Sequence, residues 1–180
     1  MADKRIDALR AVAHPQRLQM LSLLTGADMS AAEVARELGI SHASASYHLR
    51  TLHRAGHIVV AGQEQIRGGV AKRYRYVSGG VRQPSSRRRP SSVEDLITYA
   101  EALGVELKRR LVVATPARRQ FHSDIEAWVD PKVWAEAVDL LHRASQMLHE
   151  QARPPRTPGT RHVSVTAWAF PMDDGEPQQR

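Results

Sequence analysis

Residues 41–54 hold the side chains whose types and spacing are best suited to contact with a nucleic acid. At helical spacing, one face of this segment presents short hydrogen-bonding groups near its start and arginines further along. Short polar side chains can reach base edges in the major groove of DNA, and arginines can hold phosphates. The residues that we predict to contact DNA from this segment are Ser41, His42, Ala43, Ser44, Ser46, Tyr47, Arg50 and Arg54. His48 lies beside this face, and two roles stay open for it: base contact, or a hydrogen bond within the fold.

Two short helices joined by a tight turn are expected to position these side chains. Ser30 is placed to cap the first helix, with Glu33 as its capping-box partner, and Gly39 ends that helix. Ser41 is placed to cap the second helix. The inner face of the second helix is formed by Ala45, Leu49 and Leu52. This arrangement is that of a helix-turn-helix that reads DNA.

Further elements on both sides complete a larger domain. Apolar residues at helical spacing predict a helix that ends at His14 and a second helix from Pro15 to Gly26. After the helix-turn-helix, residues 58–77 alternate as a β-hairpin that turns at Arg67-Gly68-Gly69. The order predicts a winged helix-turn-helix. Its basic hairpin side chains are predicted to contact phosphates or the minor groove, and they are Arg67, Lys72 and Arg73.

Three ordered motifs in the first 77 residues resemble the ArsR-type winged-helix transcriptional regulators. They are HPQRL at 14–18, EVARELGIS at 33–41 and SYHLRTLHRAG at 46–56. The resemblance implies a homodimer that represses or otherwise controls promoters, with helix 42–55 in the major groove and hairpin 58–77 near the backbone or minor groove. Well-known members of the family sense metals, often through cysteines. This chain has Ala32-Glu33-Val34-Ala35 where the family's cysteine motif lies.

Composition agrees with a polyanionic partner for the first half of the chain. The chain has 180 residues and a formal net charge of +7. Residues 1–90 hold 15 Lys and Arg against 6 Asp and Glu, whereas residues 91–180 hold 11 against 13. The absence of cysteine excludes disulfides and thiolate metal sites. Since neither a signal peptide nor an apolar run of membrane-spanning length is visible, we expect a cytoplasmic protein without a membrane partner.

The chain is expected to divide into a winged helix-turn-helix domain (1–78), a basic flexible linker (79–90), a helical region (91–170) and a disordered tail (171–180). In the helical region, Val93 to Leu111 form a long apolar seam, residues 117–129 are expected to be helical, and Asp130-Pro131 begin another helix. The apolar side chains of that last helix are expected to face inward. Residues 162–170 alternate like a β-strand. The predicted fold class is therefore mainly α, with a small β-hairpin and one C-terminal strand.

The helical region is interpreted first as a dimerisation unit, because its seam is longer than a small domain requires. An effector pocket is a second hypothesis, for an unidentified small molecule. The aromatic residues that could line it are Tyr99, Phe121, Trp128, Trp134 and Trp168. Asp139, His142 and His149 share one side of a helix as weak metal candidates, although a solvated helix face explains them as well. We expect no cofactor.

Other function classes receive less support from the sequence. No phosphate-binding glycine loop, nucleophile elbow or HExxH motif is present, so we do not expect an enzyme. A sequence-independent architectural DNA-binding protein stays open as the alternative. The operator, the regulated genes, the direction of regulation and the pairing of the C-terminal strand are not determined by the sequence.

Overall fold

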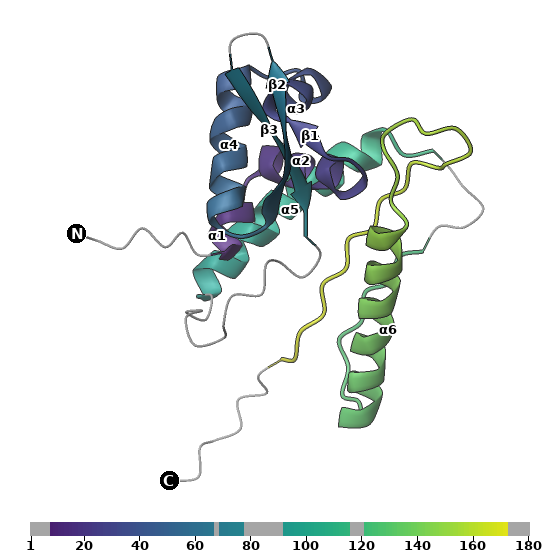
Figure 1. Cartoon of the computed structure of the whole chain (residues 1–180). Coiled ribbons are helices and arrows are strands. Elements are labelled where there is room, and N and C mark those ends of the chain that lie inside the picture. Colours follow the sequence, from purple (N-terminus) through teal and green to yellow (C-terminus); the bar gives the residue numbers. More distant parts are fainter. Residues whose placement is uncertain (1–7, 67–68, 78–91, 116–120, 173–180) are drawn as a thin grey trace.

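A small sheet and four helices form one unit, α5 packs against it, and α6 stands apart (Figure 1). The computed structural model describes residues 8–66, 69–77, 92–115 and 121–172. In chain order its elements are α1 (Ala8–Val12), α2 (Pro15–Gly26), β1 (Met29–Ser30), α3 (Ala31–Leu38), α4 (His42–Arg54), β2 (Ile58–Ile66), β3 (Gly69–Tyr76), α5 (Val93–Val112) and α6 (Pro131–Glu150). The predicted winged helix-turn-helix followed by a helical region is confirmed as a fold.

The caps that the sequence predicted for α3 and α4 are present. The Oγ atom of Ser30 accepts a hydrogen bond from the backbone N–H of Glu33 at 3.3 Å, and the Glu33 carboxylate accepts one from the Ser30 N–H at 2.7 Å. Gly39 ends α3 with a φ of 63°, a left-handed conformation that favours glycine. The Ser41 Oγ atom accepts from the backbone N–H of Ser44 at 3.1 Å. These local bonds fix the turn between the two helices.

The inner face of α4 lies in the hydrophobic core of the unit. Ala45, Leu49 and Leu52 are all fully buried there. They pack in one cluster with Met20 and Leu24 of α2 and with residues of α3, β2 and β3. Because burying a leucine side chain is worth about 2 kcal/mol, this core holds α4 in one orientation.

The sheet has a third strand that the sequence analysis missed. Its antiparallel order is β1-β3-β2, and Met29 of β1 pairs with Tyr74 of β3. A register shift between Val60 and Gly62 marks an irregularity in β2. With a length of two residues, β1 is too short to show the alternation from which strands are predicted.

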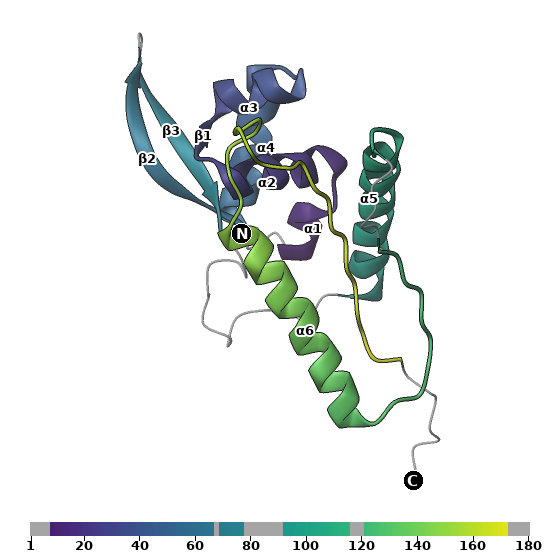
Figure 2. The ribbon, with the colours of Figure 1, turned by 90° about the vertical axis from the view of Figure 1, so that its right-hand side faces the viewer.

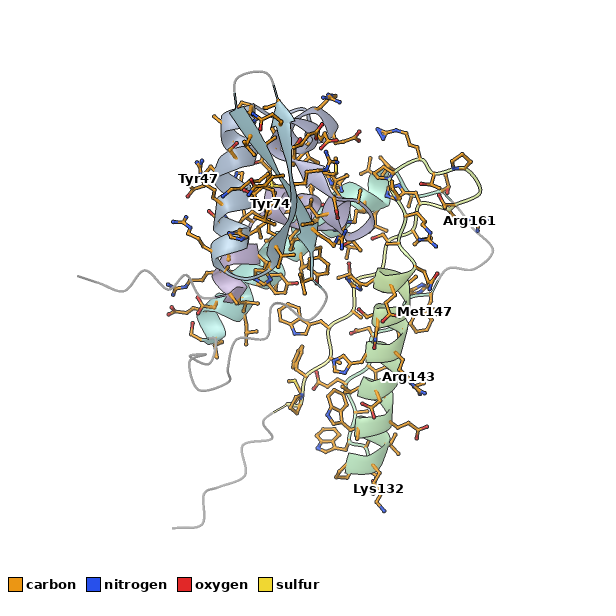
Figure 3. The ribbon with its side chains drawn as sticks, viewed as in Figure 1. Tyr47, Tyr74, Lys132, Arg143, Met147 and Arg161 are labelled. Carbon is orange, nitrogen blue, oxygen red and sulfur yellow. The ribbon has the colours of Figure 1, made fainter. Side chains whose placement is uncertain are left out.

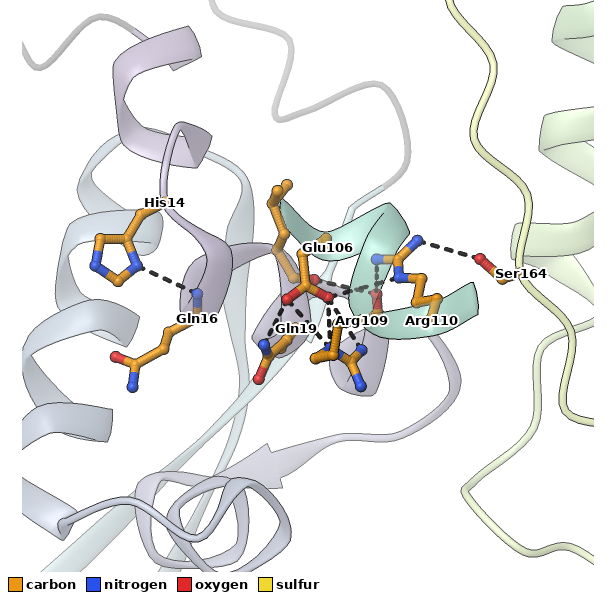
Figure 4. A network of polar contacts seen from close by, with 9 residues as sticks. His14, Gln16, Gln19, Glu106, Arg109, Arg110 and Ser164 are labelled. Carbon is orange, nitrogen blue, oxygen red and sulfur yellow. Dashed lines mark hydrogen bonds and ion pairs between the residues drawn. The ribbon is translucent and has the colours of Figure 1, made fainter. Parts of the chain in front are cut away.

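Helix α5 packs against α1 and α2 with a face that carries both polar and apolar side chains (Figure 4). Ala102 belongs to the buried core cluster, and Tyr99 and Leu103 pack against it. The Glu106 side chain is 1% exposed and accepts a hydrogen bond from Gln19 Nε2 of α2. It also pairs with Arg109 at 3.0 Å and with Arg110 at 3.6 Å. Near the start of the helix, the Asp95 carboxylate accepts a hydrogen bond from Arg10 of α1. Of the predicted apolar seam, Leu103 packs against the core, whereas Val93, Ile97 and Leu111 are exposed.

Two segments of the helical region differ from their predictions. Residues 121–130 contain no helix, and residues 162–170 contain no strand. In the first segment Phe121 is 90% exposed and Trp128 is 83% exposed, so no packing compensates the cost of ordering a short helix. The second segment has no pairing strand within the described residues, and a strand needs a hydrogen-bonded neighbour.

The apolar residues of α6 do not face inward, contrary to the prediction. Every residue of α6 lies in the described part of the chain, and none of them is buried. The predicted linker 79–90, Arg67 of the hairpin turn and residues 173–180 of the predicted tail lie outside the described residues. No helix in the described part of the chain is long and apolar enough to cross a membrane.

The segment after α6 returns to the winged helix and lies close to α2 and α3 (Figure 2). The Arg153 backbone approaches Gly26 at the end of α2 so closely that a Cβ atom on Gly26 would overlap it. The Arg156 guanidinium donates to the Glu37 carboxylate of α3 at 2.8 Å. Further along, the ring of Trp168 lies 5.6 Å from that of Tyr99 on α5. Residues 151–168, which we call the return segment, therefore attach α6 to the winged-helix unit.

Replacing Gly26 by alanine is expected to release the return segment, because the new methyl group would overlap the Arg153 backbone. Trypsin should then cleave after Arg156 and Arg161 several-fold faster than in the wild type. Gly62→Ala is the matched control, because a Cβ atom at Gly62 meets nothing within 4 Å. Equal cleavage rates in wild type and Gly26→Ala would contradict this contact.

Candidate nucleic-acid interface

The outer face of α4 is free of contacts with the sheet and core in the way that the sequence predicted (Figure 3). Tyr47 is 55% exposed and points away from the sheet. Ser41, His42, Ala43, Arg50 and Arg54 are also exposed, and Ser44 and Ser46 are half-buried. The structure thus brings the predicted contact residues of this segment to one side of one helix.

The start of α4 combines polar side chains with the positive end of a helix dipole. The Ser41 hydroxyl group is occupied by the N-cap bond to Ser44, while the side chain of His42 is exposed at the first helical position. Backbone N–H groups in the first turn of a helix attract phosphate oxygens. This end of α4 can therefore approach a DNA backbone while the following turn reaches base edges.

Of the predicted hairpin residues, Lys72 and Arg73 have different surroundings. Lys72 is exposed on β3. Arg73 pairs with Glu33 of α3 at 3.0 Å and with Glu64 of β2 at 3.1 Å, and it also donates to the Asp28 carbonyl oxygen. Arg73 therefore joins the hairpin to α3, and its contact with phosphate stays a prediction.

The carboxylates that hold the hairpin are stabilised in their charged form. Arg75 donates two hydrogen bonds to Asp28, at 2.5 and 2.6 Å, and these bonds lower the pKa of Asp28. Burial acts to raise the pKa of Glu33, but hydrogen bonds from Ser30 and Arg73 outweigh it, so that this pKa is lowered. The hairpin is thus fixed to the helix-turn-helix by ion pairs as well as by strand pairing.

A pair of histidines lies behind the contact face, and the sequence analysis did not predict it. His48 is 7% exposed, and its ring centroid lies 4.8 Å from that of His14. The Nδ1 atom of His14 accepts a hydrogen bond from the Gln16 N–H and so caps α2, whereas the buried Nδ1 atom of His48 has no partner within the described residues. This burial favours a role inside the fold for His48. Sequence spacing could not reveal the pair, because the two residues lie on different helices.

Burial lowers the pKa of both histidines, and the nearby Arg17 guanidinium lowers them further. A proton on His14 would also remove the Nδ1 lone pair that caps α2. Both rings are therefore favoured in the neutral form, and a charge on either would oppose the packing of α4 on α2.

The structure does not gather the five predicted pocket aromatics. Tyr99 and Trp168 are in contact, whereas Phe121 and Trp128 are almost fully exposed and Trp134 is half-buried. A hollow along α6 is lined instead by Lys132, Ala135, Glu136, Asp139, His142, Arg143 and Gln146. The effector pocket stays a prediction.

The three metal candidates are not assembled into a ligand set. His149 stacks on Tyr76 of β3 with a centroid distance of 5.3 Å, and its Nδ1 atom is 2.7 Å from the Ser145 carbonyl oxygen. Asp139 and His142 line the hollow on α6. Among the described residues, no group of three or more His, Asp or Glu side chains could hold a metal ion.

A comparison with known proteins bears on the part of the chain that contains the outer face of α4. Residues 12–60 match a family model described as a helix-turn-helix domain. The match runs from the end of α1 into β2 and includes all of α4. No curated protein matches the chain. The chain therefore contains a helix-turn-helix domain, and this domain supports a DNA-binding regulator.

Acid is expected to destabilise the fold through the histidine pair. The unfolded chain takes up protons near the ordinary imidazole pKa of 6.5, whereas the folded chain takes them up only at lower pH. The free energy of unfolding should thus be largest above pH 6.5 and should fall as the pH drops toward the lowered values. Urea unfolding between pH 5 and 7.5 measures this fall in the free energy of unfolding. Asp28 and Glu33 do not contribute in this range, because carboxyl groups take up protons at more acidic pH.

The slope of the free energy of unfolding against pH gives the number of protons that the chain takes up when it unfolds. In the variant His48→Gln, this number should fall by up to one. His122→Gln is the matched control, because His122 is exposed in the segment 121–130. If His48→Gln keeps the pH dependence of the wild type, His48 does not contribute to the loss of stability in acid.

Proposed function

We propose that this protein is a dimeric, sequence-specific regulator of transcription that acts as a repressor. It reads the DNA major groove with α4 and contacts the backbone or minor groove with the hairpin of β2 and β3. The observation that carries the proposal is the division of α4 into a buried apolar face and an exposed face of short polar groups, one tyrosine and two arginines.

Base reading is assigned to the first two turns of the exposed face. His42, Ser46 and Tyr47 can present hydrogen-bonding groups to base edges, and Ala43 can contact a thymine methyl group. The core residues behind them hold the helix rigidly, so these groups need little ordering when DNA binds.

Phosphate contacts are assigned to the exposed cations that flank this region. Arg50 and Arg54 follow on the same side of α4, and Lys72 is exposed on the hairpin. Such contacts supply affinity that does not depend on sequence and that weakens with salt.

Dimerisation is assigned to the apolar seam of α5. Val93 is 71% exposed, Ile97 is 55% exposed and Leu111 is 62% exposed, because a different side of α5 is turned toward α1 and α2. Ala100 and Gly104 are small residues near the centre of this seam, where a second helix could approach closely.

The charges of α5 favour an antiparallel partner of the same sequence. Glu94 and Glu101 lie in its first half, and Lys108 and Arg109 lie in its second half. Antiparallel pairing would set opposite charges against each other. A twofold dimer would present two copies of α4 to successive major grooves of one face of the DNA.

The ArsR-type assignment and the repressor role are supported by the three sequence motifs described above. Because the chain has no cysteine, we do not propose metal sensing through thiolates. An effector is proposed only as an unidentified small molecule.

Selection of bound sequences from genomic fragments tests the proposal directly. At fixed salt, the selected duplex should bind roughly a thousandfold more tightly than a random duplex. Equal affinities would favour the alternative of an architectural DNA-binding protein.

Tyr47→Ala is expected to weaken binding to the selected duplex by about tenfold or more, because it removes a base-reading group. Binding to random DNA should stay within about twofold of the wild type. Tyr47→Phe distinguishes the contribution of the hydroxyl group to binding from that of the ring. Thermal unfolding checks that both variants are folded. Equal losses on both duplexes would contradict base reading by Tyr47.

Arg54→Ala is expected to weaken binding to all sequences and to reduce the salt slope of log K by about one unit, as for one lost phosphate contact. Arg143→Ala is the matched control, since Arg143 is exposed on α6 and lies far from α4 (Figure 3). An unchanged slope in Arg54→Ala would exclude Arg54 from the phosphate contacts.

A further inference from the structure

The half-buried side chain of Arg17 on α2 lacks the partners that a buried cation normally has. Its Nη2 atom donates a hydrogen bond to the carbonyl oxygen of Arg10 on α1 at 3.1 Å, and this bond lies at the surface. Its Nε–H group is buried and has no hydrogen-bond partner within the described residues. A buried donor without an acceptor costs free energy, so its presence requires an explanation.

The other half-buried arginines among the described residues are paired with carboxylates. Arg73 pairs with Glu33 and Glu64, and Arg110 pairs with Glu106. Arg17 has no carboxylate partner in the described part of the chain. Burial lowers the pKa of Arg17, and the nearby Tyr47 side chain acts in the opposite direction. The charge of Arg17 is therefore partly desolvated without an ion pair to compensate for it.

The helices around Arg17 carry no negative charge. None of α1, α2 and α4 contains an aspartate or a glutamate. Arg17 is the third residue of α2, and a cation in the first turn of a helix is opposed by the helix dipole. An anion that could compensate Arg17 must consequently come from outside these three helices.

The backbone of this turn has no free donor to offer such an anion. Pro15 has no N–H group, and the N–H groups of Gln16, Arg17 and Leu18 all bond to His14. The guanidinium group is therefore the donor that this end of α2 presents. Because its Nη2 atom lies at the surface, an anion can approach it there.

We propose that Arg17 binds a phosphate of the DNA backbone beside the groove that α4 reads. This inference rests on the proposed function, because it takes DNA bound at α4 as its premise. Tyr47 lies on the exposed face of α4 and points away from the sheet, and Arg17 is close enough to interact with it electrostatically (Figure 3). Hydrogen bonds between a guanidinium group and a phosphate are charge-assisted and thus stronger than neutral ones.

This role separates the effect of Arg17 on DNA binding from its effect on folding. In the free protein its charge bears a desolvation cost, and bound DNA would supply the missing counter-charge. Removing the charge should therefore weaken DNA binding without making the fold less stable. An arginine with a structural role alone would give the reverse result.

The first test replaces Arg17 by methionine, which keeps an unbranched apolar stem and removes the charge. Binding to selected and random duplexes should weaken about tenfold, and the salt slope of log K should fall by about one unit. The unfolding temperature should equal or exceed that of the wild type. An unchanged salt slope or a lower unfolding temperature would each overturn the proposal.

Two other arginines provide the controls. Arg143→Met should leave DNA binding unchanged, since Arg143 is exposed on α6 and lies far from α4 (Figure 3). Arg110→Met should lower the unfolding temperature, because it removes a partner of the buried Glu106 carboxylate. This second control shows that the thermal measurement detects the loss of an arginine that does stabilise the fold.

The second test replaces single phosphates of the selected duplex by neutral methylphosphonates. At one position the wild type should lose about fivefold or more in affinity, while Arg17→Met should lose less than about twofold, because both changes remove the same contact. If every neutralised phosphate weakens the two proteins equally, Arg17 does not contact the DNA backbone.

Measurements on random DNA separate this inference from the proposed function. A salt slope reduced by Arg17→Met in a protein that prefers no sequence would overturn the proposed function alone. A clear sequence preference together with a wild-type salt slope in Arg17→Met would overturn the inference alone.

Discussion

A single buried carboxylate joins helix α5 to the winged helix. Glu106 is 1% exposed, and a charge in such a place must be paired and hydrogen-bonded. Gln19 on α2 and two arginines on α5 supply its partners. Together with the packing of Ala102 in the core cluster, these contacts turn one side of α5 toward the winged helix and leave Val93, Ile97 and Leu111 exposed. Arg110 extends the same network to Ser22 of α2 and to Ser164 of the return segment. The rotation of one helix thus decides which surfaces are left for a partner.

The DNA-binding unit is stabilised separately, by a hydrophobic core and by ion pairs. Leu49 and Leu52 anchor α4 in the core, while Asp28 and Glu33 hold the hairpin through Arg75 and Arg73. The unit can therefore present α4 rigidly without help from α6. A link between the two regions runs through the return segment, so changes in the helical region can reach α4 through α2 and α3.

Features that neighbouring residues fix could be predicted from the sequence, and features that depend on distant segments could not. The capping box at Ser30, the left-handed Gly39 and the cap at Ser41 involve residues no more than a few positions apart, and each was predictable. The short strand β1 and the His14–His48 pair depend on contacts between distant segments, and they were missed. Residues 121–129 have a helical pattern of apolar residues, but a pattern forms a helix only where a surface is available to bury it.

The helix-turn-helix, its hairpin and the exposed residues of α4 could be predicted from the sequence, because periodicity, caps and turns are local properties of the chain. The sides of α5 and α6 that face the protein could not be predicted, because they depend on contacts between segments that are far apart in the chain. The apolar spacing of both helices suggested buried seams, yet α5 buries Ala102 together with Asp95 and Glu106 and leaves Val93, Ile97 and Leu111 exposed. The physical reason is that the side of α5 that carries Tyr99, Ala102 and Leu103 packs on the hydrophobic core. On the same side, Asp95 and Glu106 find the partners on α1 and α2 that buried carboxylates require.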